Sequence, residues 1–262
     1  RLLRALCDGE AYAVPRLGDE ETVDKLQALK VYTQYRDLIS TAPLEIIYSG
    51  SADLERVKQA LAAAFATLPR EEVRVISTAA PHVCRESVQH VEDVLDVTQG
   101  KLGMGFSCGS DDMPALLMGN TLFGGSSNSK LFLNVREKLS LCYYASSLYH
   151  RQKGLITVSS GIEFQNYQRA YDEIMAQLEA VQKGELEDWE LEGARSTLLN
   201  SYATVGDSQG KLENFYLGQA ATGQHETPAD LARAIQDMTA ERICRAMSTV
   251  KLDTVYFLKG KE

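Results

Sequence analysis

The order of strand-like and helical segments after residue 88 is the feature that most constrains the fold of this chain. Four segments show the alternation or the β-branched and aromatic content of strands: residues 88–97, 99–107, 142–149 and 155–161. Because a short segment that contains Gln152-Lys153-Gly154 separates the last two, they predict a β-hairpin. Helical patterns cover 113–122, 130–139 and most of 167–250, and a last strand lies at 255–258. We therefore expect an α+β fold, an α/β sandwich in which helices pack on one face of a mostly antiparallel sheet.

The first 83 residues form a shorter block that does not complete a sheet by itself. The apolar run 44–50 predicts a buried strand that ends at a glycine turn, and a helix is expected to begin after Asp53. Between 71 and 84 the residues become small, polar and extended, which is typical of a linker. These changes predict two domains, one at 1–83 and one at 84–262.

Composition excludes several classes of function. The formal net charge of −9 argues against nucleic-acid binding, which depends largely on Lys and Arg at phosphates, and against a polybasic membrane-binding segment. No apolar run approaches the roughly 20 residues that cross a bilayer. The five cysteines are scattered without a CxxC pair, and no export signal is visible. We expect a cytoplasmic protein with free thiols, without a membrane or nucleic-acid partner.

The histidines do not form a zinc motif. There are only four, and none stands in HxxEH or HExxH, the spacings that place two ligands on one face of a helix. His82 and Glu86 are four apart, but no second histidine is near enough to complete the motif. The sequence therefore predicts no metal ligand and no cofactor in this chain.

Two other chemistries are disfavoured by spacing. The glycine- and serine-rich stretch 123–130 lacks the glycine before Lys130 and the hydroxyl residue after it that a phosphate-binding loop requires, so we expect a turn there. Cys142 and His150 could act as nucleophile and base only if the chain turned back between them. An extended strand of eight residues spans roughly 26 Å, and no triad signature surrounds this pair.

Arg136 and Tyr143 offer a different possibility. Arg136 lies near the end of a predicted helix and Tyr143 at the start of a predicted strand, so both side chains could reach one cleft. A guanidinium and a phenol are donors suited to a carbonyl oxygen that develops negative charge. The structural alternative is an arginine that caps a helix and a tyrosine at a sheet edge. Spacing alone leaves both interpretations open.

The same segment resembles a known family. Residues 124–132 (GGSSNSKLF) and 135–143 (VREKLSLCY) are similar to the signature of the second, "inactive" domain of the pitrilysin/insulinase/mitochondrial processing peptidase family of zinc metallopeptidases. Residues 99–106 (QGKLGMGF) resemble the strand that opens that domain, and residues 12–18 (YAVPRLG) resemble a loop of the preceding domain. The resemblance covers nearly the whole chain, in the order that the family has.

The resemblance implies different roles for the two domains. In this family a first domain binds zinc through HxxEH and a distal Glu, and a second domain closes over the substrate. In active members an Arg and a Tyr of the second domain reach the substrate carbonyl, and these match Arg136 and Tyr143. Zinc is thus expected only upstream of Arg1 or on a partner. The ending, residues 256–260, resembles small bacterial paralogues encoded in pairs, of which one lacks HxxEH.

These observations predict a non-catalytic half of such a peptidase, which binds and encloses peptide substrates and is not catalytic alone. Arg136 and Tyr143, with Ser126, Ser127 and Asn128, are the expected substrate-binding residues, and the sheet edge at 155–161 is expected to pair with an extended peptide. The expected partner is a second copy or a paralogue that carries HxxEH. Two alternatives stay open: a scaffold subunit without substrate, and the C-terminal part of an active peptidase whose HxxEH domain lies upstream.

Overall fold

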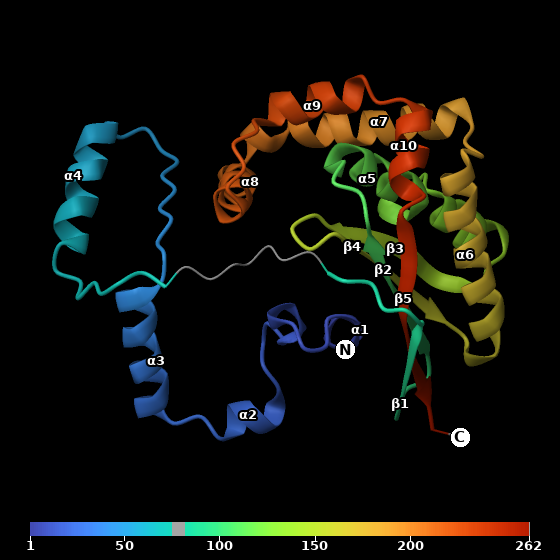
Figure 1. Cartoon of the computed structure of the whole chain (residues 1–262), viewed down its shortest axis with the longest axis horizontal. Helices are drawn as coiled ribbons and strands as arrows, with labels where there is room; N and C mark the ends of the chain where they lie inside the picture. Colours follow the sequence, from blue (N-terminus) through green and yellow to red (C-terminus); the bar gives the residue numbers. More distant parts are fainter. Residues whose placement is uncertain (75–81, 262) are drawn as a thin grey trace. The chain divides into compact units, whose positions relative to one another are not determined.

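The computed structural model describes residues 1–74 and 82–261 (Figure 1). These residues divide into two compact units. The first, here called the sheet unit, holds the described residues among 1–14, 80–204 and 226–262. The second, the helical unit, holds those among 15–79 and 205–225. None of the helices in these residues combines the length and the apolar character that a bilayer crossing requires.

A five-stranded sheet forms the centre of the sheet unit. Its order is β1-β5-β2-β4-β3 (Figure 1). β1 pairs parallel with β5, and the other three pairings are antiparallel. The predicted α+β class with a mostly antiparallel sheet is confirmed. The predicted hairpin is confirmed as β3 and β4. The strands are β1 (Gln89–Leu95), β2 (Gly100–Cys108), β3 (Cys142–His150), β4 (Leu155–Ile162) and β5 (Val250–Gly260).

Helices cover one face of this sheet and enclose the main core. Leu102, Met104 and Phe106, alternate residues of β2, pack there with the buried stripe of α6, which includes Ile174 and Leu178. The helices of this layer are α5 (Met113–Asn120), α6 (Tyr167–Lys183), α7 (Asp188–Ala203), α9 (Pro228–Gln236) and α10 (Ala240–Met247), with the π-helices η2 (Thr121–Gly125) and η3 (Leu131–Lys138) and the 3₁₀ turn η4 (Phe164–Asn166).

The opposite face of the sheet carries the short helix α1 (Leu2–Leu6) and the 3₁₀ turn η1 (Ala11–Ala13). Two glycines of β2 make room for α1. A Cβ added at Gly103 would lie 3.2 Å from Leu2, and one added at Gly105 would lie 2.7 Å from Leu6. Because side chains alternate across a strand, the glycines at these positions leave the core-facing residues of β2 undisturbed.

In the described residues of the helical unit, all regular elements are helices. They are α2 (Glu20–Asp24), α3 (Ala28–Thr41), α4 (Leu54–Phe65), the 3₁₀ turn η5 (Val205–Asp207) and α8 (Gln209–Thr222). The predicted buried strand at 44–50 is wrong. No strand of the described chain pairs with this run, and Ile46 and Ile47 are exposed. A strand needs a hydrogen-bonding neighbour, which an apolar run cannot supply by itself.

The predicted division at residue 83 stays a prediction. Residues 1–14 pack on the sheet, so the compact units follow a different grouping from the predicted segments 1–83 and 84–262. The central part of the predicted linker, residues 75–81, lies outside the described residues.

Candidate functional site

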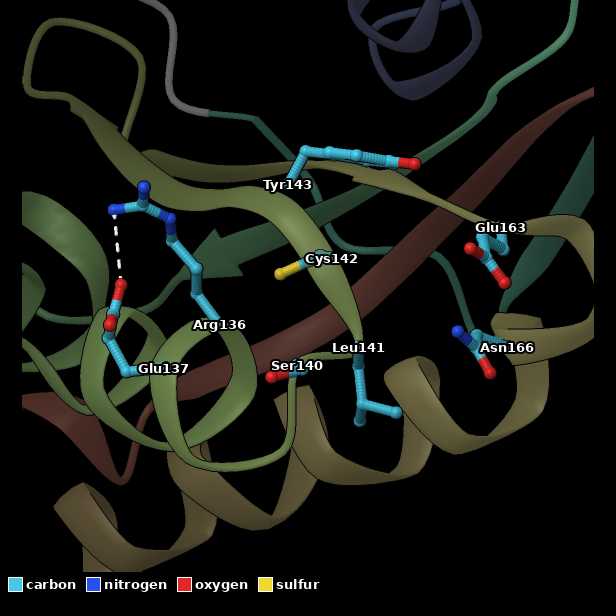
Figure 2. A pocket seen from close by; sticks show the side chains of 8 residues that line it. All are labelled: Arg136, Glu137, Ser140, Leu141, Cys142, Tyr143, Glu163 and Asn166. Atoms are coloured by element: carbon cyan, nitrogen blue, oxygen red, sulfur yellow. Dashed lines mark ion pairs between the residues drawn. The ribbon is translucent and has the colours of Figure 1, made fainter.

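A cavity of about 490 Å³ lies where η3, β3 and the segment after β4 meet (Figure 2). All of its lining residues belong to the sheet unit. They are Arg136, Glu137, Ser140, Leu141, Cys142, Tyr143, Glu163 and Asn166. The two predicted donors, Arg136 and Tyr143, thus line one cavity.

A sharp reversal of the chain brings these two residues together. η3 ends with a π-type hydrogen bond from the Leu139 N–H to the Asn134 carbonyl oxygen (3.1 Å). Ser140 follows with φ 51°, the only left-handed φ of a non-glycine residue in the described chain. The Leu141 N–H then donates to the Val135 oxygen (3.1 Å), and β3 begins at the next residue. Left-handed residues are typical of helix C-termini, but most belong to glycine because a side chain costs about 1–2 kcal/mol there.

Tyr143 is directed outward by a bulge in an edge strand. Across β3 and β4, Cys142 pairs with Ile162 and Tyr144 pairs with Gly161, so Tyr143 is an extra residue without a partner. Its side chain is 63% exposed, and the neighbouring Tyr144 is exposed as well, which breaks the alternation of the strand. Bulges of this kind re-aim side chains next to active sites.

Arg136 is oriented by two neighbours and stays accessible. Its guanidinium lies 4.6 Å from the ring centroid of Phe132, and its Nη1 lies 3.4 Å from Glu137 Oε1. Both charged side chains are at least 40% exposed, so this ion pair holds the guanidinium only weakly. Figure 2 shows the Tyr143 ring directed away from the Arg136 guanidinium.

The predicted residues Ser126, Ser127 and Asn128 do not line this cavity. The Ser126 hydroxyl donates to the Thr121 carbonyl oxygen (3.3 Å). Asn128 lies toward α7, where a Cβ added at Gly193 would be 3.9 Å from its Nδ2. Their role in substrate binding stays a prediction.

A buried ion pair anchors the end of this glycine- and serine-rich loop. Lys130 Nζ lies 2.9 and 3.0 Å from the two carboxylate oxygens of Glu190 on α7, and both side chains are buried. Glu190 Oε2 also accepts the Glu187 N–H in the capping box that begins α7. Lys130 therefore has a structural partner within the protein. Residues 126–129 form the expected turn, whereas residues 123–125 belong to η2.

Cys142 and His150 do not form a catalytic pair. They stand at opposite ends of the continuous strand β3. The ring nitrogens of His150 hydrogen-bond Tyr12 Oη and Thr157 Oγ1, each at 3.0 Å. Burial raises the pKa of the Cys142 thiol, which lowers its thiolate fraction.

The predicted edge at 155–161 is wrong. β4 lies between β2 and β3, so its backbone is paired on both sides, and β3 is the edge. η2 packs against part of β3, because a Cβ added at Gly124 would lie 2.8 Å from the Ser147 nitrogen. Tyr143 and Tyr144, at the end of β3 beside the cavity, are exposed, as is Leu148 farther along the strand.

Sequence reasoning missed Glu163 and Asn166, which line the cavity from the turn after β4. It also missed a group on the opposite face of the sheet, where Cys7, Glu10 and His82 bring metal-binding atoms together. Short motifs detect neither set, because the members come from distant segments.

Residues 25–198 match the sequence model of the family described as "Peptidase M16 inactive domain". The chain belongs to this family. The expected resemblance to the inactive domain of a zinc metallopeptidase family is therefore confirmed. The sequence contains neither HxxEH nor HExxH, so its own residues do not fit the zinc site that the family's peptidases carry.

Relatives agree with this assignment. The "Probable inactive metalloprotease YmfF" of Bacillus subtilis (strain 168) is 36% identical over 269 residues, which cover 100% of this chain and 62% of that protein. The "Uncharacterized zinc protease YmxG" of the same strain is 23% identical over 154 residues, 56% of this chain and 38% of that protein.

Solved structures show the same fold. A conserved protein from Enterococcus faecalis V583 has a TM-score of 0.87 at 25% identity, over 99% of this chain and 62% of that one. The peptidase M16 inactive domain from Pseudomonas fluorescens has a TM-score of 0.79 at 16% identity, over 100% of this chain and 64% of that one. This chain therefore spans about three fifths of the length of these relatives.

Proposed function

We propose that this chain is the non-catalytic, substrate-binding half of a pitrilysin-like zinc peptidase and that it helps to bind and enclose peptides. One observation carries the proposal: Arg136 and Tyr143, two accessible hydrogen-bond donors, line a single cavity beside the exposed stretch of an edge strand. Membership of the inactive-domain family and the lack of HxxEH support a chain that does not cleave peptides alone.

The geometry suits an extended peptide. A peptide that adds to the exposed part of β3 would find backbone partners there, as in other cases of strand addition. The Arg136 guanidinium and the Tyr143 hydroxyl would then donate to a peptide carbonyl oxygen. Glu137 and Glu163, which line the same cavity, favour a peptide with a basic side chain near that carbonyl.

A partner completes the proposed enzyme. Within the helical unit, α3 exposes Leu29, Tyr32 and Leu38, apolar side chains of a kind that interfaces cover. Of the exposed residues of α3, Val31, Tyr35 and Leu38 recur at i, i+4 and i+7 and so share one face of the helix. We assign this face to an HxxEH-bearing paralogue in a heterodimer, and a homodimer is the alternative outcome in a sizing experiment. The five cysteines are free, which supports the cytoplasm as the site of this assembly.

Peptide binding tests the proposal directly. The whole chain is titrated into fluorescently labelled extended peptides with basic residues, and anisotropy is measured. We expect saturable binding that Arg136→Ala and Tyr143→Phe each weaken by about tenfold, equivalent to the loss of one hydrogen bond to a charged or phenolic donor. Arg245→Ala and Tyr216→Phe change exposed residues that do not line the cavity, so they are the matched controls and should leave binding unchanged.

The alternatives give different outcomes. A scaffold subunit without substrate predicts no saturable binding to any peptide. An active peptidase with its HxxEH domain in the same polypeptide predicts cleavage without a second protein. Equal binding by the wild type and both cavity variants would show that Arg136 and Tyr143 are not the donors.

A further inference from the structure

Three potential metal ligands converge on the sheet face that α1 covers. Cys7 follows the end of α1, Glu10 precedes η1, and His82 precedes β1. One ligand atom of each residue, a thiol sulfur, a carboxylate oxygen and an imidazole nitrogen, lies within 4.8 Å of the other two. Cys7 is fully buried, and the His82 side chain is only 3% exposed. All three belong to the sheet unit.

The two ring nitrogens of His82 face two different carboxylates. Its Nδ1 lies 2.6 Å from Glu10 Oε1, and its Nε2 lies 3.2 Å from Asp253 Oδ2. A neutral imidazole carries one N–H and can therefore donate to only one of these carboxylates. The other contact places a nitrogen lone pair against a carboxylate oxygen. A metal ion can accept that lone pair and bind the carboxylate oxygen at the same time.

The surroundings fix which nitrogen is free for a metal. Asp253 is fully buried and accepts the Arg85 backbone N–H (2.8 Å), Arg85 Nη1–H (2.6 Å) and the Thr254 hydroxyl (2.7 Å). With its carboxylate held in this way, Asp253 can accept Nε2–H of His82 and leave Nδ1 directed at Glu10. A carboxylate that orients a ligating histidine through its other nitrogen is the usual outer shell of a protein zinc site.

Glu10 is also oriented by a contact to one of its two carboxylate oxygens. The ammonium of Lys153, itself buried, pairs with Glu10 Oε2 and leaves Oε1 for the group that His82 contacts. In His82 the protein holds Nε2, and in Glu10 it holds Oε2. The remaining atoms, His82 Nδ1 and Glu10 Oε1, face each other.

We propose that Cys7, Glu10 and His82 bind a zinc ion through Sγ, Oε1 and Nδ1. A mixed sulfur, nitrogen and oxygen donor set suits Zn²⁺ and not the hard cations Mg²⁺ and Ca²⁺, which take oxygen ligands. Three protein ligands leave the fourth position of a tetrahedral ion to water. Binding releases the thiol proton of Cys7 to solvent, so the thiolate, Glu10 and Asp253 together balance zinc and part of the charge of Lys153 and Arg85.

This site differs from the zinc site of the family's peptidases and departs from the sequence-based expectation of no metal ligand in the chain. Glu10 and His82 are 72 residues apart, so no spacing motif joins them. The ion would fasten residues 1–14 to the sheet through His82 and the Asp253 of β5. Its role is therefore to stabilise the sheet unit, whatever the function of the cavity at Arg136.

Metal titration tests the site. The whole chain is stripped with a chelator and titrated with Zn²⁺ in competition with a chromophoric chelator, and Co²⁺ serves as a spectroscopic probe. We expect one equivalent of Zn²⁺ per chain, a thiolate-to-cobalt charge-transfer band, and no response to Mg²⁺. Cys7→Ser and His82→Gln should each weaken Zn²⁺ binding at least tenfold and remove or shift the cobalt band, whereas Cys84→Ser and His90→Gln should behave as wild type.

Two results would overturn the proposal. One is the absence of stoichiometric Zn²⁺ binding by the folded wild-type chain, which would mean that a proton joins His82 to Glu10. The other is a zinc X-ray absorption spectrum of the wild type without a sulfur neighbour. This second measurement decides the question even if the Cys7 or His82 variants do not fold.

Discussion

The Arg136 guanidinium and the Tyr143 phenol line the same cavity because the chain reverses between them at Ser140, the left-handed residue that joins η3 to β3. The reversal places one donor on the last turn of a helix and the other on the bulge of an edge strand. The position of both donors thus depends on the backbone conformation of one residue that lines the cavity but is not itself a proposed donor.

Substitution of Ser140 tests this dependence. Because β-branched residues tolerate a positive φ poorly, Ser140→Val should lower the free energy of unfolding by about 1–2 kcal/mol, whereas Ser140→Gly should change it by less than about 0.5 kcal/mol. Urea denaturation measures both. Equal stability of the valine variant and the wild type would contradict a left-handed Ser140.

Lys130→Met should be strongly destabilising. It leaves the buried Glu190 carboxylate without its cation, which costs about 3–5 kcal/mol. Lys183→Met breaks an exposed ion pair with Glu179 and should have little effect on stability. If denaturation gave the same small loss for both variants, the Lys130–Glu190 pair would not be buried as described.

The ion pair between Asp112 and Arg242 should make stability depend on pH. Arg242 donates to both carboxylate oxygens (2.6 and 2.9 Å), and this hydrogen bonding lowers the pKa of Asp112 in the folded chain. The pKa of Asp112 is thus lower in the folded chain than in the unfolded chain, where it is roughly 3.9. The ionised carboxylate therefore stabilises the fold fully above that unfolded pKa, and this stabilisation is lost as the pH falls through the folded pKa.

Asp112→Asn keeps a residue that can cap α5 but removes the charge. It should be less stable than the wild type by about 1 kcal/mol at neutral pH, and the two should converge in acid. Thermal denaturation at a series of pH values measures this difference. A difference that stays constant down to the lowest pH would show that the carboxylate charge is not responsible.

Gly105→Ala should loosen α1. The new methyl group would meet Leu6 at 2.7 Å, so α1 or the Leu6 side chain must shift, at a cost of about 1–3 kcal/mol. Gly206→Ala, where an added Cβ meets nothing within 4 Å, is the matched control and should be nearly neutral. Limited proteolysis measures the effect on α1. Residues 1–14 should be cleaved faster in Gly105→Ala than in the wild type, and at the wild-type rate in Gly206→Ala.

Local patterns predicted the parts of the fold that local chemistry determines. Gln152-Lys153-Gly154 predicted the hairpin of β3 and β4 because a short turn between two strand-like runs leaves few alternatives. The order of strands depends on a distant segment instead. β5 begins at Val250 and enters between β1 and β2, which no local pattern indicates. The assignment of 155–161 as an edge failed because β4 pairs with β2 as well as with β3, and the pairing with β2 has no local signal either.

The residues of the candidate sites likewise fall into those that a local segment indicates and those that it does not. Arg136 and Tyr143 were found through spacing and family resemblance, since both lie in one continuous segment. Ser140 was not singled out, because serine gives no signal for a left-handed conformation. The group of Cys7, Glu10 and His82 was missed because tertiary packing alone brings its members together.

Reconstitution of peptide cleavage tests the proposed function most directly. The whole chain is assayed for cleavage of an extended peptide alone, and then together with an HxxEH-bearing paralogue. We predict no cleavage by the chain alone, cleavage by the mixture well above that of the paralogue alone, and a loss of about 10²-fold with Arg136→Ala or Tyr143→Phe. Cleavage by the chain alone, or a mixture no more active than the paralogue, would contradict a non-catalytic, substrate-binding half.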